Sequence, residues 1–216
     1  DRLYGSIKSF FALPDEVKSK YEKPEIGYQR GYTGKGKEHA KGRNTGDLKE
    51  FYHVGQELEF IPDTDPIKSE YPENLWPMEI PQFQQDAIEA YQTLENAGKQ
   101  MLRAIALNLE LPEDYFEDKV AHGNSILRQI HYFPIENPDE VPADAVRAAE
   151  HGDINLITLL MGASADGLQV LRKDGKLYAW GLNNYGQLGD RTLVNRNSPV
   201  PVFMDGALSG AVITQI

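Results

Sequence analysis

Residues 151–160, HGDINLITLL, begin with a histidine and an aspartate one residue apart and continue as an apolar run. The run predicts a strand, and in a strand residues i and i+2 point to the same face of the sheet. His151 and Asp153 are therefore expected to lie side by side. An imidazole and a carboxylate so placed supply two-thirds of the 2-His-1-carboxylate triad, which binds non-haem Fe(II) and leaves positions open for oxygen and a co-substrate.

The third ligand of such a triad does not follow in the sequence. The histidines are His39, His53, His122, His131 and His151, so none lies beyond His151. On spacing alone the pair has a second interpretation, in which His151 ends a helix and Asp153 caps the start of a strand. His131 is expected to pack within a strand, and His53 either to line a pocket or to lie at the surface.

Composition narrows the class of protein. The chain has 216 residues, enough for one large domain or two small ones, and 40% of them are apolar. Its net charge of −11 would repel phosphate backbones, so nucleic acid is not an expected ligand. It has no cysteine, no secretory signal and no apolar stretch of the roughly 18 residues that a membrane span needs. We expect a cytoplasmic protein that binds no membrane; its oligomeric state is left open.

The apolar spacing predicts helices in the first half of the chain. Two helical pieces are expected within residues 3–21, the second starting at Pro14, and the longest helix over residues 82–109, where an apolar stripe runs up to Pro112. Residues 24–47 lack periodicity and are expected to be irregular. Five prolines in residues 61–81 exclude long regular elements there. Short helices are expected at residues 112–119 and 142–150.

Strands are expected mainly in the second half. Residues 47–57 predict a short strand or bend, and further strands are expected at residues 125–133, 153–161, 167–172 and 176–180, with Asp174-Gly175 as a hairpin turn. Helices first and short strands later indicate an α+β fold, in which helices pack on a β-sandwich or jelly roll.

A family resemblance becomes specific over residues 151–176, HGDINLITLLMGASADGLQVLRKDGK. This stretch resembles the metal-binding core of the 2-oxoglutarate- and Fe(II)-dependent oxygenases, in the branch similar to isopenicillin N synthase. In that family an H-x-D motif opens a strand and G-L-Q-V lies on the next. Upstream, LRQIHYFP (127–134), RGYTGKGKEHAKG (30–42) and GDLKEFYHVGQE (46–57) also resemble family members. The resemblance covers residues 1–176 and implies a partial double-stranded β-helix, or jelly roll, that is incomplete at both ends.

The resemblance also implies a chemistry. His151 and Asp153 match the family's first two iron ligands, 2-oxoglutarate would be the co-substrate, and a small molecule would be oxidised. Tyr132 matches the region where the family places a tyrosine hydroxyl near the co-substrate carboxylate, although its neighbour Phe133 fits that position as well. The family's second histidine, fifty or more residues after H-x-D, is missing. Arg196-Asn197-Ser198 forms the R-x-S string of the family's co-substrate clamp, but too close to His151.

The last residues resemble another family. Residues 174–216, with LYAWGLNNYGQLGD at 177–190, are similar to one repeat of the regulator of chromosome condensation type, which forms a blade of a β-propeller. We expect an oxygenase-like domain, truncated, at 1–175 and a propeller-repeat-like β segment at 176–216, with strands at 178–180, 199–204 and 211–216. Since the distal histidine is missing, an inactive oxygenase and a non-catalytic interaction module or fusion fragment remain alternatives.

Overall fold

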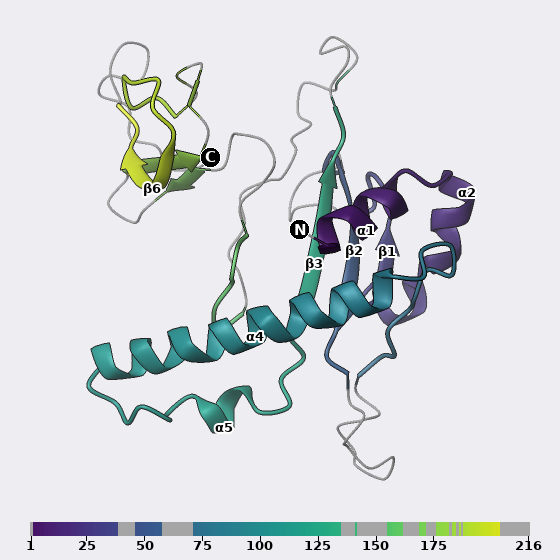
Figure 1. Cartoon of the computed structure of the whole chain (residues 1–216), viewed down its shortest axis with the longest axis horizontal. Coiled ribbons are helices and arrows are strands. Elements are labelled where there is room, and N and C mark those ends of the chain that lie inside the picture. The colour runs from purple at the N-terminus through teal and green to yellow at the C-terminus, as the bar shows by residue number, and fades with distance from the viewer. Residues whose placement is uncertain are drawn as a thin grey trace. The chain divides into compact units, whose positions relative to one another are not determined.

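A computed structural model shows the fold of two compact units, Asp1–Ala149 and Glu150–Ile216, each of which is described by itself (Figure 1). The structure describes residues 2–38, 46–57, 71–134, 141, 155–161, 169–171, 176–181, 183–184, 186 and 188–203. The regular elements among these residues are helices and two antiparallel sheets, which confirms the α+β class. No helix among them is long and apolar enough to cross a membrane.

The first unit consists of helices around one three-stranded sheet. Its helices are α1 (Arg2–Phe11), α2 (Asp15–Lys18), the 3-10 turns η1 (Ser19–Tyr21) and η2 (Pro24–Ile26), α4 (Phe83–Asn108) and α5 (Glu117–Val120). Its strands are β1 (Gly31–Thr33), β2 (Lys49–Gly55) and β3 (Ile126–Tyr132), in the order β1-β2-β3 with both pairs antiparallel.

Most of the expected elements of this unit are confirmed. Pro14 stands immediately before α2, where its fixed φ and missing N–H suit a helix start. The long helix and the strands near residues 50 and 130 lie where the pattern places them. The prediction of an irregular segment over residues 24–47 is wrong at β1. Three residues are too short for a visible alternation, and β1 exists because β2 pairs with it from Thr33 opposite Phe51 to Gly31 opposite His53.

Alternation along the paired strands gives the sheet two faces. The helix face carries Tyr32, Glu50, Tyr52, Val54, Leu127, Gln129 and His131; the far face carries Thr33, Lys49, Phe51, His53, Arg128, Ile130 and Tyr132. Tyr32, Tyr52 and Val54 of the helix face form the core with Ile7 and Phe10 of α1.

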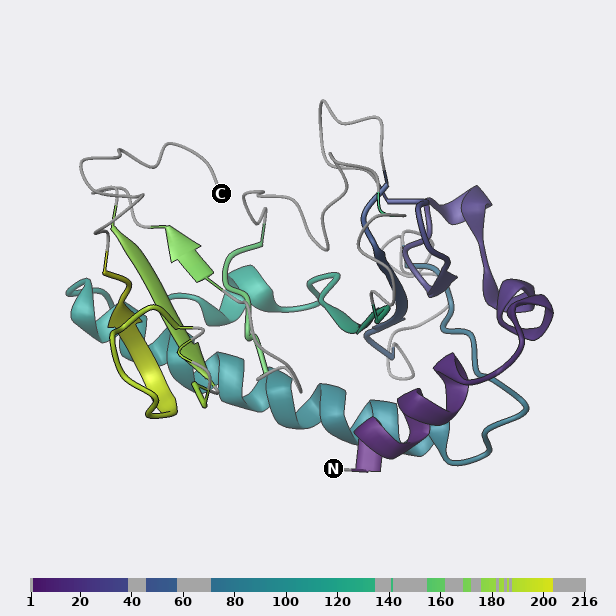
Figure 2. The ribbon, with the colours of Figure 1, turned by 90° about the horizontal axis from the view of Figure 1, so that it is seen from above.

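Phe10 is the centre of this core. It is fully buried, and its ring meets Tyr52 edge to face with centroids 4.8 Å apart and Tyr32 in the same manner at 5.7 Å. Phe83 closes the cluster from the start of α4. Figure 2 shows α1 lying beside the N-terminal part of α4, where Ser6 hydrogen-bonds Asp86 and Arg2 pairs with Glu89. The core therefore fixes α1 on the sheet.

Burial along α4 follows the predicted stripe only in part. Tyr91 and Leu102 are buried as expected, whereas Met101 and Leu109 are exposed. The small residues Ala87, Gly98 and Ala106 are buried in their place. The prediction of the helix is thus correct, and the prediction of its buried side is wrong toward the C-terminal end.

Gly31, at the start of β1, allows a test of this fold. Its φ is +78°, and a Cβ there would lie 2.2 Å from the backbone oxygen of Tyr21. We expect Gly31→Ala to destabilise the first unit by at least about 2 kcal/mol, because both the left-handed backbone and the clash oppose a side chain. Denaturant unfolding measures the change. Gly5→Ala is the matched control, since space is free around Gly5 in α1, and it should stabilise by about 0.5–1 kcal/mol. Equal stabilities of the two variants would contradict this account of β1.

The second unit contains a three-stranded antiparallel sheet in the order β4-β5-β6. The strands are β4 (Gln169–Leu171), β5 (Leu177–Gly181) and β6 (Arg196–Pro201). Strands expected at residues 167–172, 176–180 and 199–204 are confirmed in outline, although β6 begins and ends three residues earlier than predicted. Leu171 lies opposite Leu177 in the ladder, so β4 and β5 form a hairpin.

The strand expected at residues 153–161 is wrong for the part that the structure describes. Residues 155–161 are not in a strand, and Leu156 and Leu160 are exposed. An apolar run becomes a strand only where another strand accepts its backbone hydrogen bonds. The helix expected at 142–150, the turn Asp174-Gly175 and the strand at 211–216 lie outside the described residues.

Candidate functional site

The predicted iron ligands lie in a part of the chain that the structure leaves undescribed. His151 and Asp153 are both outside the described residues, so their pairing stays a prediction. Among the residues that are described, no three histidine, aspartate or glutamate side chains come together in a way that could hold a metal ion. Any complete iron site in this chain therefore needs donors from the undescribed segments.

Tyr132, the predicted co-substrate contact, is placed clearly. It is the last residue of β3, lies opposite Lys49 of β2, and belongs to the far face of the sheet. Its side chain is 37% exposed, so a ligand can reach it. Phe133 follows the end of the strand, and its ring lies 5.1 Å from that of His131. The structure thus distinguishes the two neighbours: Tyr132 has a defined strand position, and Phe133 has none.

A histidine and an arginine form the centre of the far face. His53 Nδ1 lies 2.9 Å from the carbonyl oxygen of Tyr28, and Arg128 Nε donates a 2.7 Å hydrogen bond to His53 Nε2. Since Nε2 accepts, Nδ1 carries the proton and donates to Tyr28, and the imidazole is neutral. Burial, followed by the charge of Arg128, lowers the pKa of His53 to about 4. His53 is 5% exposed, so the surface interpretation of this residue is wrong.

Arg128 is held by further contacts. Its guanidinium lies 4.4 Å from the centre of the Phe51 ring and 3.2 Å from Glu38. Glu38 also pairs with the buried Lys49 at 2.6 Å, and Lys49 reaches Asp47 at 2.9 Å. Burial alone would lower the pKa of Lys49, but its hydrogen bonds to the two carboxylates raise it instead. The far face therefore carries two cations and two carboxylates in one network.

This network could not be predicted from the sequence. Arg128 and His53 are 75 positions apart, and only the register that puts them opposite one another brings them together.

His53 gives the first unit a pH dependence of known sign. The pKa of its imidazole is about 4 in the folded chain, against an ordinary value of 6.5. As the pH falls, the imidazole is therefore protonated in the unfolded chain before it is protonated in the folded chain. Stability attributable to His53 is complete above about pH 6.5 and lost as the pH falls toward 4, by on the order of 3 kcal/mol. Denaturant unfolding between pH 7 and pH 4 should show a shallower decline for His53→Gln than for the wild type. Parallel curves would contradict the neutral, buried imidazole.

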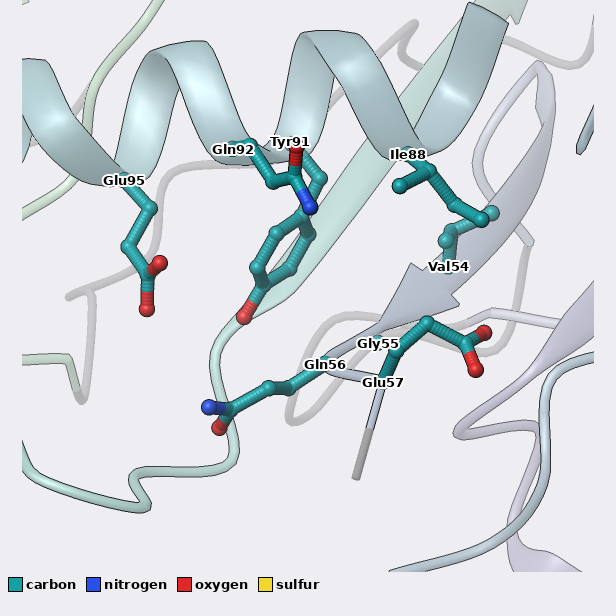
Figure 3. A pocket seen from close by; sticks show the side chains of 8 residues that line it. All are labelled: Val54, Gly55, Gln56, Glu57, Ile88, Tyr91, Gln92 and Glu95. Atoms are coloured by element: carbon teal, nitrogen blue, oxygen red, sulfur yellow. The ribbon is translucent and has the colours of Figure 1, made fainter. Parts of the chain in front are cut away.

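A separate small pocket lies at the other end of the sheet. Its volume is about 100 Å³, and it is lined by Val54, Gly55, Gln56 and Glu57 at the end of β2 and by Ile88, Tyr91, Gln92 and Glu95 on one side of α4 (Figure 3). Tyr91 points from α4 toward the chain that follows β2. Gly55 pairs with Ile126 at one end of β3, whereas Tyr132 is at the other. The pocket is therefore not the site that the sequence predicts.

Comparison with known proteins confirms both parts of the resemblance. Residues 1–79 match the family model described as the N-terminal part of the non-haem dioxygenase in morphine synthesis, and residues 174–216 match the regulator of chromosome condensation (RCC1) repeat. The first of these two matches points to the 2-oxoglutarate- and Fe(II)-dependent oxygenases, and most of this chain is similar to members of that family. The second match covers only the end of the chain.

Individual relatives give the extent of the similarity. The 2-oxoglutarate-dependent dioxygenase htyE of Aspergillus rugulosus is 32% identical over 174 residues, covering 79% of this chain and 52% of its own length. The 2-oxoglutarate-Fe(II) type oxidoreductase hxnY of Emericella nidulans is 29% identical over 183 residues, covering 79% and 50%. The chain thus spans about half the length of the curated relatives it matches.

Solved structures agree. A protein of Caulobacter crescentus assigned to the 2OG-Fe(II) oxygenase family is 43% identical, with a TM-score of 0.68 over 82% of this chain and 55% of that protein. A C-terminally truncated protein of Neurospora crassa, solved in its apo form, is 30% identical, with a TM-score of 0.57 over 82% and 58%. Relatives more than 30% identical over about four fifths of this chain show that it belongs to the 2-oxoglutarate- and Fe(II)-dependent oxygenases.

Proposed function

We propose that this chain carries an Fe(II)- and 2-oxoglutarate-dependent dioxygenase domain that oxidises a small molecule. The observation that supports the proposal most strongly is the 43% identity and common fold, over 82% of the chain, with a protein assigned to the 2OG-Fe(II) oxygenase family. Residues 1–175 would form the oxygenase-like domain, a partial jelly roll with helices on one side, and residues 176–216 the propeller-repeat-like segment. The proposed iron ligands are His151 and Asp153, and Tyr132 is the proposed contact of 2-oxoglutarate.

The donor set suits the cofactor in kind but not in number. An imidazole and a carboxylate are the ligand types that non-haem Fe(II) takes in oxygenases, and three protein donors are the usual count. The chain has no histidine after His151, and the described residues form no group of three donors. His151 and Asp153 therefore account for two of the three donors, and we assign no third ligand.

The roles of the protein's own residues follow from this assignment. Bound iron and 2-oxoglutarate would supply the oxidising chemistry, while the protein orients the substrate and excludes water. Tyr132, accessible on the far face, would donate its hydroxyl hydrogen to the co-substrate carboxylate. Arg128, Phe51 and the neutral His53 lie on that same face and would line the space beside it.

The substrate class rests on the relatives. The names of similar proteins include a proline hydroxylase, buaE of Petromyces alliaceus, and a full-length protein of Neurospora crassa was solved in complex with alpha-KG. The first name points to a small-molecule substrate, the second concerns the co-substrate, and the net charge of −11 argues against a nucleic-acid substrate. We propose a small organic substrate for this chain as well, in a cytoplasmic setting.

One observation favours a second function. Residues 174–216 match a repeat that belongs to β-propellers, and within residues 1–216 no histidine follows His151. A chain with an incomplete iron site and a propeller-type repeat would serve as a non-catalytic interaction module.

Turnover separates the two functions. Purified chain with Fe(II), ascorbate and oxygen should convert 2-oxoglutarate to succinate slowly, at a rate proportional to the protein concentration. His151→Ala should abolish the conversion. His122→Ala is the matched control, because His122 lies in the turn after α5, and it should retain the activity. No succinate above the iron-only blank would favour the interaction module.

A further inference from the structure

A buried carboxylate joins four elements of the first unit on the helix face. Glu50 is fully buried, and its Oε2 accepts hydrogen bonds from Lys18 Nζ at 2.8 Å and from the hydroxyl of Tyr32 at 2.5 Å. Its other oxygen, Oε1, lies 2.8 Å from Nδ1 of His131. Because an ionised carboxylate only accepts, His131 Nδ1 is the donor. Glu50 of β2 thus ties α2, β1 and β3 together.

Two of these partners, Lys18 and Tyr32, bond the same oxygen of the carboxylate, Oε2. Lys18 is 3% exposed and compensates the charge of Glu50, while Tyr32 supplies a second hydrogen bond. Burial and the bond to Glu50 raise the pKa of Tyr32, so it remains a donor. His131, whose side chain is 39% exposed, needs no buried partner, because water can reach it. The bond from His131 therefore satisfies Oε1, and for the half-exposed imidazole it sets the orientation of the ring.

The ring of His131 is also clamped from its sides. It stacks on Phe11 of α1, with centroids 5.2 Å apart and planes at 24°, and meets Phe133 at 5.1 Å. With one nitrogen bonded to Glu50, both the position and the rotation of the imidazole are set. A side chain held in this way at residue 131 restrains the backbone on either side of it.

This restraint falls at the last two pairs of the ladder, where His131 lies opposite Glu50 and Tyr132 opposite Lys49. The ladder between β2 and β3 ends at the pair Lys49 and Tyr132, and strand ends open most readily. Since neighbouring residues of a strand point to opposite faces, fixing His131 toward the helices directs Tyr132 to the far face.

We propose that Glu50 is a positioning residue, which holds His131 and through it the end of β3, so that Tyr132 is presented to the co-substrate. The second half of this proposal, that Tyr132 is presented to the co-substrate, rests on the proposed function. The first half, that Glu50 holds His131 and the end of β3, concerns the chain alone. The two halves have separate readouts.

Hydrogen exchange of the full chain, followed by NMR, tests the first half. His131→Phe keeps the stacking on Phe11 but removes the bond to Glu50, and we expect the amides of residues 130–132 to exchange about tenfold faster. His131→Asn keeps an amide donor for Glu50 and should restore slow exchange. Tyr32→Phe is the matched control: it removes another partner of Glu50 and should leave these amides unchanged. Unchanged exchange in His131→Phe, or equal acceleration in Tyr32→Phe, would overturn the proposal.

Co-substrate affinity tests the second half. With Fe(II) and without oxygen, 2-oxoglutarate should bind His131→Phe about tenfold more weakly than the wild type and His131→Asn, in line with the loss of one oriented hydrogen bond. A wild type that binds 2-oxoglutarate, with His131→Phe binding it equally well, would overturn the link to Tyr132. A wild type that binds none would refute the proposed function, and the exchange experiment would still decide the role of Glu50.

Discussion

Glu50→Ala is expected to destabilise the first unit by about 3 kcal/mol or more. The substitution leaves the buried ammonium of Lys18 without its buried partner and removes acceptors from Tyr32 and His131. Breaking a buried ion pair by removing one partner costs far more than the pair itself contributes, because the remaining charge stays desolvated. Asp15, 3.0 Å from Lys18 but almost fully exposed, would compensate only part of this loss. Denaturant unfolding at neutral pH measures the effect.

The matched control removes both charges together. If the uncompensated Lys18 causes the loss, the double variant Glu50→Gln, Lys18→Met should recover at least half of the stability that Glu50→Ala loses, because replacing both members of a buried pair is often nearly neutral. A double variant as unstable as Glu50→Ala would show that the carboxylate contributes through Tyr32 and His131 instead. Glu50→Ala with wild-type stability would contradict the described burial of the cluster.

The second large effect is expected at the proposed metal site. His151→Ala and Asp153→Ala should each weaken Fe(II) binding by at least about 100-fold, since even the loss of an outer partner of a metal ligand costs 10–100-fold. Each variant removes one of the two proposed donors, and both should therefore lose affinity to a similar extent. Anaerobic calorimetric titration of each variant with Fe(II) measures this. Binding that survives in both variants would place the metal elsewhere in the chain.

Helices and the strands of the family motifs could be predicted because their signals are local. Pro14 marks the start of α2, and the apolar stripe marks α4, whatever the rest of the chain does. β1 and residues 155–161 show the opposite case. Whether three residues or an apolar run become a strand depends on a partner far away in the sequence, and alternation alone does not reveal that partner.

The site could be predicted only by residue type. The H-x-D pattern indicates donors, and the LRQIHYFP motif indicates Tyr132 or its neighbour Phe133 as the co-substrate contact; both signals are local, and both assignments stay predictions. The bonds from Arg128 to His53 and from His131 to Glu50 span 75 and 81 positions, and they follow from the register of the β2-β3 pair. Such contacts decide which polar residue is buried and neutral, and no local pattern contains them.

The second unit shows how the two resemblances meet. β4 includes part of the G-L-Q-V string of the oxygenase-like sequence, and β5 opens the repeat-like sequence, yet the two strands pair from Leu171 opposite Leu177 to Gln169 opposite Ala179. The hairpin thus crosses the predicted boundary at residues 175 and 176. A boundary between sequence families is therefore not a boundary between strands of this sheet.

Anaerobic addition of 2-oxoglutarate to the Fe(II)-loaded wild-type chain tests the central claim most directly. If His151 and Asp153 hold iron with positions open for a chelating 2-oxo acid, a visible charge-transfer absorption should appear, saturate at one equivalent per chain, and be absent from His151→Ala. A chain that binds no Fe(II), or an absorption that is the same in wild type and His151→Ala, would contradict the assignment of this protein to iron-dependent oxidation.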